Sequence, residues 1–149
     1  MDRLSRALNV ALPWLLALWI AYIFVWYLQY KFFGHEGSVW LFTVLTDWLG
    51  FSGFEKITRI GVGTVELGAA ILCLYRRTQL VGGLAATGVM TGAIFFHVVS
   101  PLGIDPYDDG AVLFKEALLV WAAGLGLAYL RRGDLPDILR LANIGPRTA

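Results

Sequence analysis

Long apolar stretches separated by short polar segments dominate the chain. Four of these stretches approach or exceed the about 20 residues that a helix needs to cross a bilayer. They cover residues 8–32, 57–75, 79–99 and 111–130. The pattern predicts an all-α integral membrane protein whose four transmembrane helices form one bundle, a single domain over residues 1–149.

Two shorter segments have a helical pattern of polar and apolar positions. Residues 39–49, in the connection between the first two spans, mix aromatic and aliphatic side chains with polar ones and predict a short helix at the membrane interface. Residues 134–143 place their apolar side chains on one helical face, with Pro136 in the first turn. They predict a short amphipathic helix within a cytoplasmic tail over residues 132–149.

Composition supports the membrane assignment and excludes other classes. The chain is 58% hydrophobic and 15% charged, with a mean hydropathy of +0.66, which is far more apolar than a soluble domain of this size. A net charge of +1 is too small for an electrostatic nucleic-acid binder. With a single cysteine, Cys73, and two distant histidines, we expect neither an intramolecular disulfide nor a metal site.

The basic residues are distributed unevenly along the chain and indicate its orientation. Cytoplasmic segments of membrane proteins are enriched in Lys and Arg. Placing both termini in the cytoplasm puts most of the basic residues there: Arg3, Arg6, Arg76, Arg77, Arg131, Arg132, Arg140 and Arg147. The first apolar stretch is too long for a signal peptide and is interpreted as a retained anchor. We therefore predict a multi-pass protein of the inner (plasma) membrane.

Ionisable residues inside the predicted spans are costly and mark a candidate site. Glu66 is the strongest candidate, because it lies deepest in the membrane. It is about 14 Å from the cytoplasmic end of its helix when each residue adds about 1.5 Å. The others fall in the outer half of the membrane: Lys31, Arg59, His97, Lys115 and Glu116. These six residues predict a ligand-binding polar pocket that opens outward; no residue is assigned a catalytic role.

Several of these residues also have a structural interpretation. Glu66 either serves a ligand or has a structural role, in which it stays protonated or pairs with Lys115 and holds the second span to the fourth. His97 either contacts a ligand or donates to a helix or loop carbonyl, and its depth differs from that of Glu66 by about 13 Å, so the two should not touch. Lys115 and Glu116 lie about 100° apart on a helix, so at most one faces the pocket.

Glycine is frequent inside the spans, and Gly88 and Gly92 form a G-x-x-x-G step. Small residues at this spacing let transmembrane helices approach closely. We interpret this step as a contact between helices within one bundle in preference to a contact between two copies of the chain. A homo-oligomer remains a possible partner arrangement.

Motifs at the ends of the spans resemble the DoxX-like family of small bacterial membrane proteins, over about residues 12–130. They are Lys31–Gly34 (KFFG), Gly37–Thr43 (GSVWLFT), Arg59–Gly63 (RIGVG) followed by Glu66-Leu67, and Gly92–His97 (GAIFFH). The resemblance implies a four-helix bundle in the inner membrane. It also implies association, in some members, with redox enzymes, including the membrane subunit of thiosulfate:quinone oxidoreductase.

Two functions remain open at this point. The chain is either a redox-associated membrane subunit that binds a quinone or another lipophilic molecule, without a covalent cofactor, or a scaffold whose buried polar residues only fix helix packing. The first requires a redox-enzyme partner, and both require the lipid bilayer. Independent catalysis by this chain is not favoured. A transporter is disfavoured because the sequence shows no inverted repeat.

Overall fold

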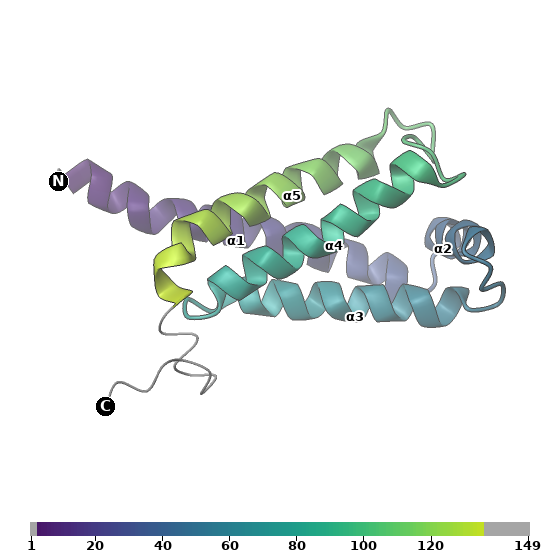
Figure 1. Ribbon diagram of the computed structural model, residues 1–149, viewed down its shortest axis with the longest axis horizontal. Coiled ribbons are helices and arrows are strands. Elements are labelled where there is room, and N and C mark those ends of the chain that lie inside the picture. The colour runs from purple at the N-terminus through teal and green to yellow at the C-terminus, as the bar shows by residue number, and fades with distance from the viewer. Residues whose placement is uncertain (1–2, 136–149) are drawn as a thin grey trace.

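Helices make up nearly all of the protein. The structure, a computed structural model, describes the backbone of residues 3–135 and the side chains of residues 10–135. Residues 3–135 form five α-helices and one short 3-10 helix (Figure 1): α1 Arg3–Phe32, α2 Glu36–Trp48, α3 Glu55–Leu74, α4 Gln79–Val99, α5 Val112–Arg131 and η1 Arg132–Asp134. Four of the helices, α1, α3, α4 and α5, are long and apolar enough to cross a membrane. The prediction of an all-α, four-span bundle is confirmed.

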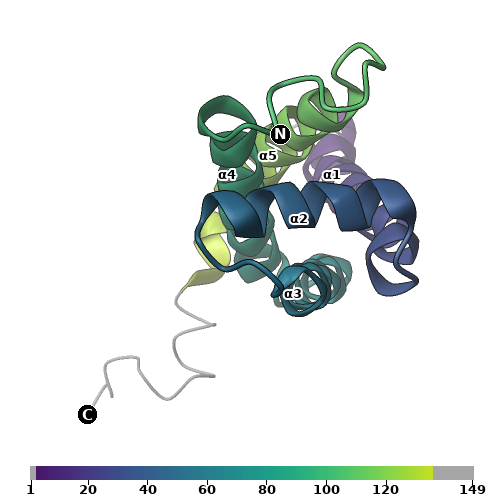
Figure 2. The ribbon, with the colours of Figure 1, turned by 90° about the vertical axis from the view of Figure 1, so that its right-hand side faces the viewer.

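The four long helices form a closed ring in which each packs against two neighbours. α1 packs on α3 and α5, and α4 also packs on α3 and α5. α2 crosses one end of this ring and packs mainly on α3 (Figure 2). We call this the α2 end of the bundle, and the opposite end, where α3 and α4 are joined, the turn end.

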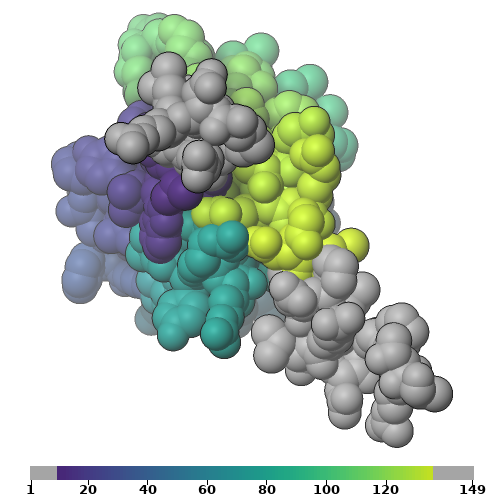
Figure 3. All heavy atoms as spheres, turned by 90° about the vertical axis from the view of Figure 1, so that its left-hand side faces the viewer, coloured from purple at the N-terminus to yellow at the C-terminus, as the bar shows by residue number. Residues whose placement is uncertain are grey.

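Polar contacts tie the turn end together. Arg76, in the short connection between α3 and α4, forms an ion pair with Asp134 of η1, at 2.5 Å from Nη1 to Oδ2. The Arg131 Nε at the end of α5 donates to the Oε1 of Gln79, the fully buried first residue of α4, at 2.7 Å. Figure 3 shows the turn, in teal, beside the end of α5, in yellow. The short turn makes α3 and α4 antiparallel neighbours.

Glycine brings α4 close to both of its neighbours near the turn end. A Cβ atom on Gly82 would lie 2.5 Å from a backbone nitrogen of α3, and one on Gly83 would lie 2.8 Å from the carbonyl oxygen of Gly124 in α5. Side chains at these positions would force the helices apart. Close backbone approach at small residues is the usual mode of packing between transmembrane helices.

The predicted role of Gly88 and Gly92 is wrong. A Cβ atom on either residue would have no neighbour within 4 Å, so neither glycine permits a close helix contact within the chain. The spacing is correct for a packing motif, but α3 has already diverged from α4 at this height. Gly82 and Gly83, one to two turns closer to the α3–α4 connection, take that role instead.

Helix boundaries agree with the predictions to within a few residues, with two differences. α1 begins at Arg3, not at residue 8, so Pro13 lies well inside the helix and not in its opening turns. α2 begins three residues before the predicted interfacial helix, where the His35 Nδ1 accepts from the Gly37 N–H at 3.3 Å and caps it. The predicted tail helix at 134–143 lies outside the described residues except for Asp134, which ends η1, and Leu135.

The apolar core is divided into two parts. The larger part fills the ring of long helices and includes Ile20, Phe24, Val120 and Leu127, all almost fully buried. The smaller part lies where α2 packs on the bundle, and it consists of Leu41, Phe42 and Leu45 of α2 and Leu102 of the connection between α4 and α5. The division leaves room between the dense half of the bundle and the underside of α2, and the candidate site occupies that space.

Candidate functional site

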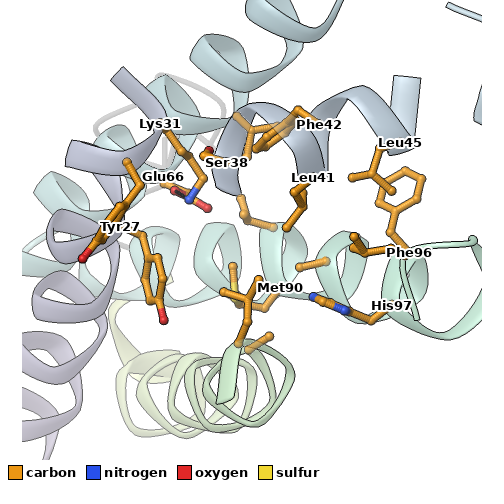
Figure 4. A pocket seen from close by; sticks show the side chains of 18 of the residues that line it. Tyr27, Lys31, Ser38, Leu41, Phe42, Leu45, Glu66, Met90, Phe96 and His97 are labelled. Carbon is orange, nitrogen blue, oxygen red and sulfur yellow. Dashed lines mark ion pairs between the residues drawn. The ribbon is translucent and has the colours of Figure 1, made fainter. Parts of the chain in front are cut away.

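A cavity of about 700 Å³ lies inside the α2 end of the bundle. All five α-helices contribute to its wall, which is mostly apolar (Figure 4): Phe24 of α1, Leu41 of α2, Val62 of α3, Phe96 of α4 and Leu113 of α5 are examples. Its volume falls within the roughly 300–1,000 Å³ range of pockets that enclose small molecules. The prediction of a polar pocket is therefore corrected to an apolar cavity that carries a few polar groups.

A buried ion pair forms one polar group of the cavity. Lys31, in the last turn of α1, places its Nζ 2.9 Å from the Glu66 Oε2 in the middle of α3, and both side chains are largely buried. The Lys31 ammonium also lies over the Tyr27 ring, 5.5 Å from its centroid. Gly63 allows the approach, because a Cβ there would lie 2.9 Å from the Phe32 ring.

The alternative pairing of Glu66 with Lys115 is wrong. Lys115 is exposed and does not line the cavity. The partner of Glu66 is Lys31, which the sequence placed near the outer end of the first span. A Cα–Cβ bond tilts toward the N-terminus of its helix. Because α1 and α3 are antiparallel, the two side chains tilt toward each other and the long lysine chain covers the remaining distance.

A second polar group joins α1 to α5. The Tyr27 hydroxyl donates to the Glu116 Oε2 at 2.5 Å, and both residues line the cavity. Of the neighbours Lys115 and Glu116 only Glu116 faces inward, as the angle between adjacent helical residues requires. Tyr27 was not singled out from the sequence. Its position four residues before Lys31, on the same helical face, is the signal that would have found it.

His97 lies on another side of the cavity from the ion pair (Figure 4). Its side chain is almost fully buried, and its Nδ1 lies 2.7 Å from the carbonyl oxygen of Gly103. A carbonyl only accepts, so the hydrogen is on Nδ1 and donates to Gly103. No hydrogen bond or ion pair joins His97 to Glu66 within the part of the chain described here. The structure thus shows the bond to a loop carbonyl and places His97 on the cavity wall, while its contact with a ligand stays a prediction.

Arg59 lies outside the cavity and has a structural role. It is buried, pairs with Glu55 one turn earlier in α3, and donates through Nη1 to the backbone carbonyl of Lys31. That carbonyl belongs to the last turn of α1, where backbone acceptors lack helical partners. Of the six candidate residues, the structure therefore brings four to the cavity and leaves Arg59 and Lys115 outside it.

The loop between α4 and α5 covers part of the cavity at the α2 end. The Tyr107 hydroxyl donates to the Gly37 carbonyl of α2 at 2.9 Å, and burial raises the pKa of this phenol, so it stays protonated as the donor. The Ala111, Asp109 and Gly110 backbone N–H groups hold the pKa of Asp105 below its ordinary value. Tyr107 could not be predicted as a cavity residue, because nothing in a loop sequence indicates a contact with a distant helix.

Metal-binding groups do not gather in the part of the protein that the structure covers. Within residues 3–135, no three His, Cys, Asp or Glu side chains are placed so that they could hold a metal ion.

Comparison of the sequence with protein-family models and with curated proteins finds no match, and comparison of the structure with solved structures finds none either. No relative therefore assigns a role to these residues. The cavity and the side chains that line it are the basis for a functional proposal.

Proposed function

We propose that this multi-span membrane protein binds one lipophilic molecule with a compact hydrogen-bonding head, such as a quinone, in the cavity. The observation that carries the proposal is a mostly apolar cavity of about 700 Å³ with ionisable side chains placed at a few points of its wall. Ligand sites typically combine apolar walls with a small number of placed polar groups. Ionisable residues inside a membrane span are energetically unfavourable, and they usually occur there because they have a function.

The polar groups offer both donors and acceptors to such a head. The Lys31 ammonium has three N–H donors, of which Glu66 needs one, so the others can donate to a quinone carbonyl. The Glu116 carboxylate receives the Tyr27 hydroxyl and keeps further acceptor capacity for the hydroxyl of a reduced quinol. The site thus offers hydrogen bonds to the oxidised and to the reduced form.

We further propose that the protein acts as the membrane subunit of a redox enzyme. The resemblance of its span-end motifs to the DoxX-like family supports this step, as does a cavity that suits a quinone. In this role the chain would hold the lipophilic electron carrier, and the partner would carry out the electron transfer.

Quinone binding provides the test. The wild-type protein in lipid nanodiscs is expected to bind decylubiquinone saturably, measured by quenching of tryptophan fluorescence. Binding of the reduced form, decylubiquinol, whose hydroxyls donate to a carboxylate or to the unprotonated Nε2 of His97, should be weakened about tenfold or more by Glu66→Gln, which keeps an oxygen for Lys31, and by His97→Ala, because a hydrogen bond to a charged or buried group is lost. Lys115→Ala, next to Glu116 but outside the cavity, should bind like wild type. Absence of saturable binding by well-folded wild-type protein contradicts the proposal.

A structural scaffold is the second candidate, and one observation favours it. The polar groups already contact one another between different parts of the fold, through the Lys31–Glu66 ion pair and through the hydrogen bonds of Tyr27 with Glu116 and of His97 with the Gly103 carbonyl. If this is their whole role, Glu66→Gln and His97→Ala lower the melting temperature in detergent while wild type binds no quinone. Retained melting with lost binding supports the ligand site instead.

We also propose that both termini lie in the cytoplasm. Arg76, Arg77, Arg131 and Arg132 lie at the turn end, whereas the connection at the α2 end carries Asp105, Asp108 and Asp109. Cytoplasmic loops carry the excess of Lys and Arg. The cavity then opens in the outer half of the membrane.

Reporter fusions test this orientation. A fluorescent protein fused after Arg77 should be bright and alkaline phosphatase fused there inactive, with the reverse result after Asp109. Signals from the same side at both positions contradict the four-span topology, and opposite signals with the signs exchanged contradict only the orientation.

A further inference from the structure

Glycines form part of the side wall of the cavity between α3 and α4. Gly61 of α3 and Gly88 and Gly92 of α4 all line the cavity, and a Cβ atom on any of them would meet nothing within 4 Å. Gly61 and Gly88 are also exposed on the outside of the bundle. Gly61 and Gly88 therefore contact both the cavity and the surroundings of the protein, and Gly92, which is half-buried, lies one helical turn further along α4.

The divergence of α3 and α4 creates this gap. The two helices are in close contact at Gly82 near the turn end and separate toward the α2 end (Figure 1). Gly61 and Gly92 lie equally far along their helices from the turn that joins them, and so do Val65 and Gly88. The glycines of α4 are one helical turn apart, so the missing side chains leave a continuous opening along the helix axis.

The opening faces lipid and not water. It lies within two of the candidate membrane spans, and the exposed side chains around it are apolar: Val65, Leu84 and Phe95. The end of the cavity nearest water is covered by α2, whose Leu41, Phe42 and Leu45 pack as a buried cluster beneath it. Access through the bilayer is thus less obstructed than access from the aqueous side.

A buried polar side chain lies behind the opening. Glu66 is 4% exposed and lines the cavity. Its Oε2 is 2.9 Å from the Lys31 Nζ, but without hydrogen-bond alignment, and it forms no hydrogen bond with any other described residue. A buried carboxylate oxygen normally has a hydrogen-bond partner. A ligand hydroxyl near Glu66 would donate the hydrogen bond that its Oε2 lacks.

We propose that the gap lined by Gly61, Gly88 and Gly92 is a lateral opening through which a ligand dissolved in the bilayer reaches the cavity. The inference rests on the proposed function and names its ligand class: an amphiphile with a compact polar head and one apolar chain. The head lies near Lys31 and Glu66, and the chain extends between α3 and α4 into the lipid.

Two probes that differ only in the chain test this opening. Decylubiquinone has an apolar chain, and 2,3-dimethoxy-5-methyl-1,4-benzoquinone is its head alone. Gly88→Phe, Gly92→Phe and Gly61→Phe, each measured in nanodiscs, should weaken binding of decylubiquinone about tenfold or more and leave the affinity for the head unchanged. Gly68→Phe is the matched control, because Gly68 also has open space around it but does not line the cavity, and it should bind both probes like wild type.

The outcomes separate this inference from the function on which it rests. If wild type binds neither probe, the proposed function fails. If wild type and every glycine variant that folds bind decylubiquinone equally well, the inference of a lateral opening is overturned, while the proposed function stands. Equal loss of both probes also overturns it, because the added ring then acts on the head site. Testing glycines on both helices keeps the result decisive if one variant fails to fold.

Discussion

Replacing Gly124 with leucine is expected to separate α4 from α5 and to destabilise the bundle severely. A Cβ atom at this position would lie 2.5 Å from the Thr87 hydroxyl oxygen and 2.8 Å from the Gly83 carbonyl oxygen. The backbone carbonyl cannot move aside as a flexible side chain would. Overpacking of a dense interior costs about 1–3 kcal/mol and occasionally more, and here a whole helix must shift, so we expect about 3 kcal/mol or more.

The measurement is the thermal midpoint and the monodispersity of the purified protein in detergent. Gly68→Leu is the matched control, since a Cβ on Gly68 would meet nothing within 4 Å and the change adds the same side chain inside a span. A Gly124→Leu protein that melts together with wild type would show that α4 and α5 do not cross at Gly83 and Gly124.

Removing Lys31 alone should be far more damaging than removing it together with Glu66. The pair is largely buried, so Lys31→Met leaves a carboxylate without its counter-ion, at a cost of about 3–5 kcal/mol. The double variant Lys31→Met with Glu66→Met removes both charges. Buried pairs replaced by apolar side chains of similar size are often neutral in stability, so we expect the double variant within about 1 kcal/mol of wild type.

Unfolding of the four proteins of this double-mutant cycle, followed by helical circular dichroism in mixed micelles, gives the coupling energy directly. Lys115→Met serves as the control, because Lys115 is exposed and outside the cavity. Additive effects of the two single changes would contradict the ion pair. The double variant should also lose decylubiquinone binding while it remains folded, which separates the role of the pair in binding from its role in stability.

The spans could be predicted from the sequence because the requirement behind them is simple. A bilayer demands a minimum apolar length, and four stretches meet it, so each helix ends within a few residues of its predicted position. Charged residues inside such stretches are rare enough to be noticed. For this reason Glu66, Lys31, His97 and Glu116 could be identified as cavity residues before any geometry was known.

The pairing of these residues could not be predicted in the same way. Depth along an axis ignores how each helix is rotated and how far a long side chain reaches, so Glu66 was matched with Lys115 and not with Lys31. Tyr27 was missed because aromatic residues are common in α1 and only its partner Glu116, far away in the sequence, distinguishes it. The G-x-x-x-G spacing of Gly88 and Gly92 likewise says nothing about where two helices diverge.

Lys31 is held to α3 at two separate points, and this has a mechanical consequence. Its side chain pairs with Glu66, while its backbone carbonyl accepts a hydrogen bond from Arg59. The ammonium group is free to turn toward a ligand, but the backbone that carries it stays anchored by a different residue. In the proposed function, ligand exchange at this side of the cavity therefore needs only a rotation of the Lys31 side chain, and the backbone at the end of α1 need not move when the cavity is filled or emptied.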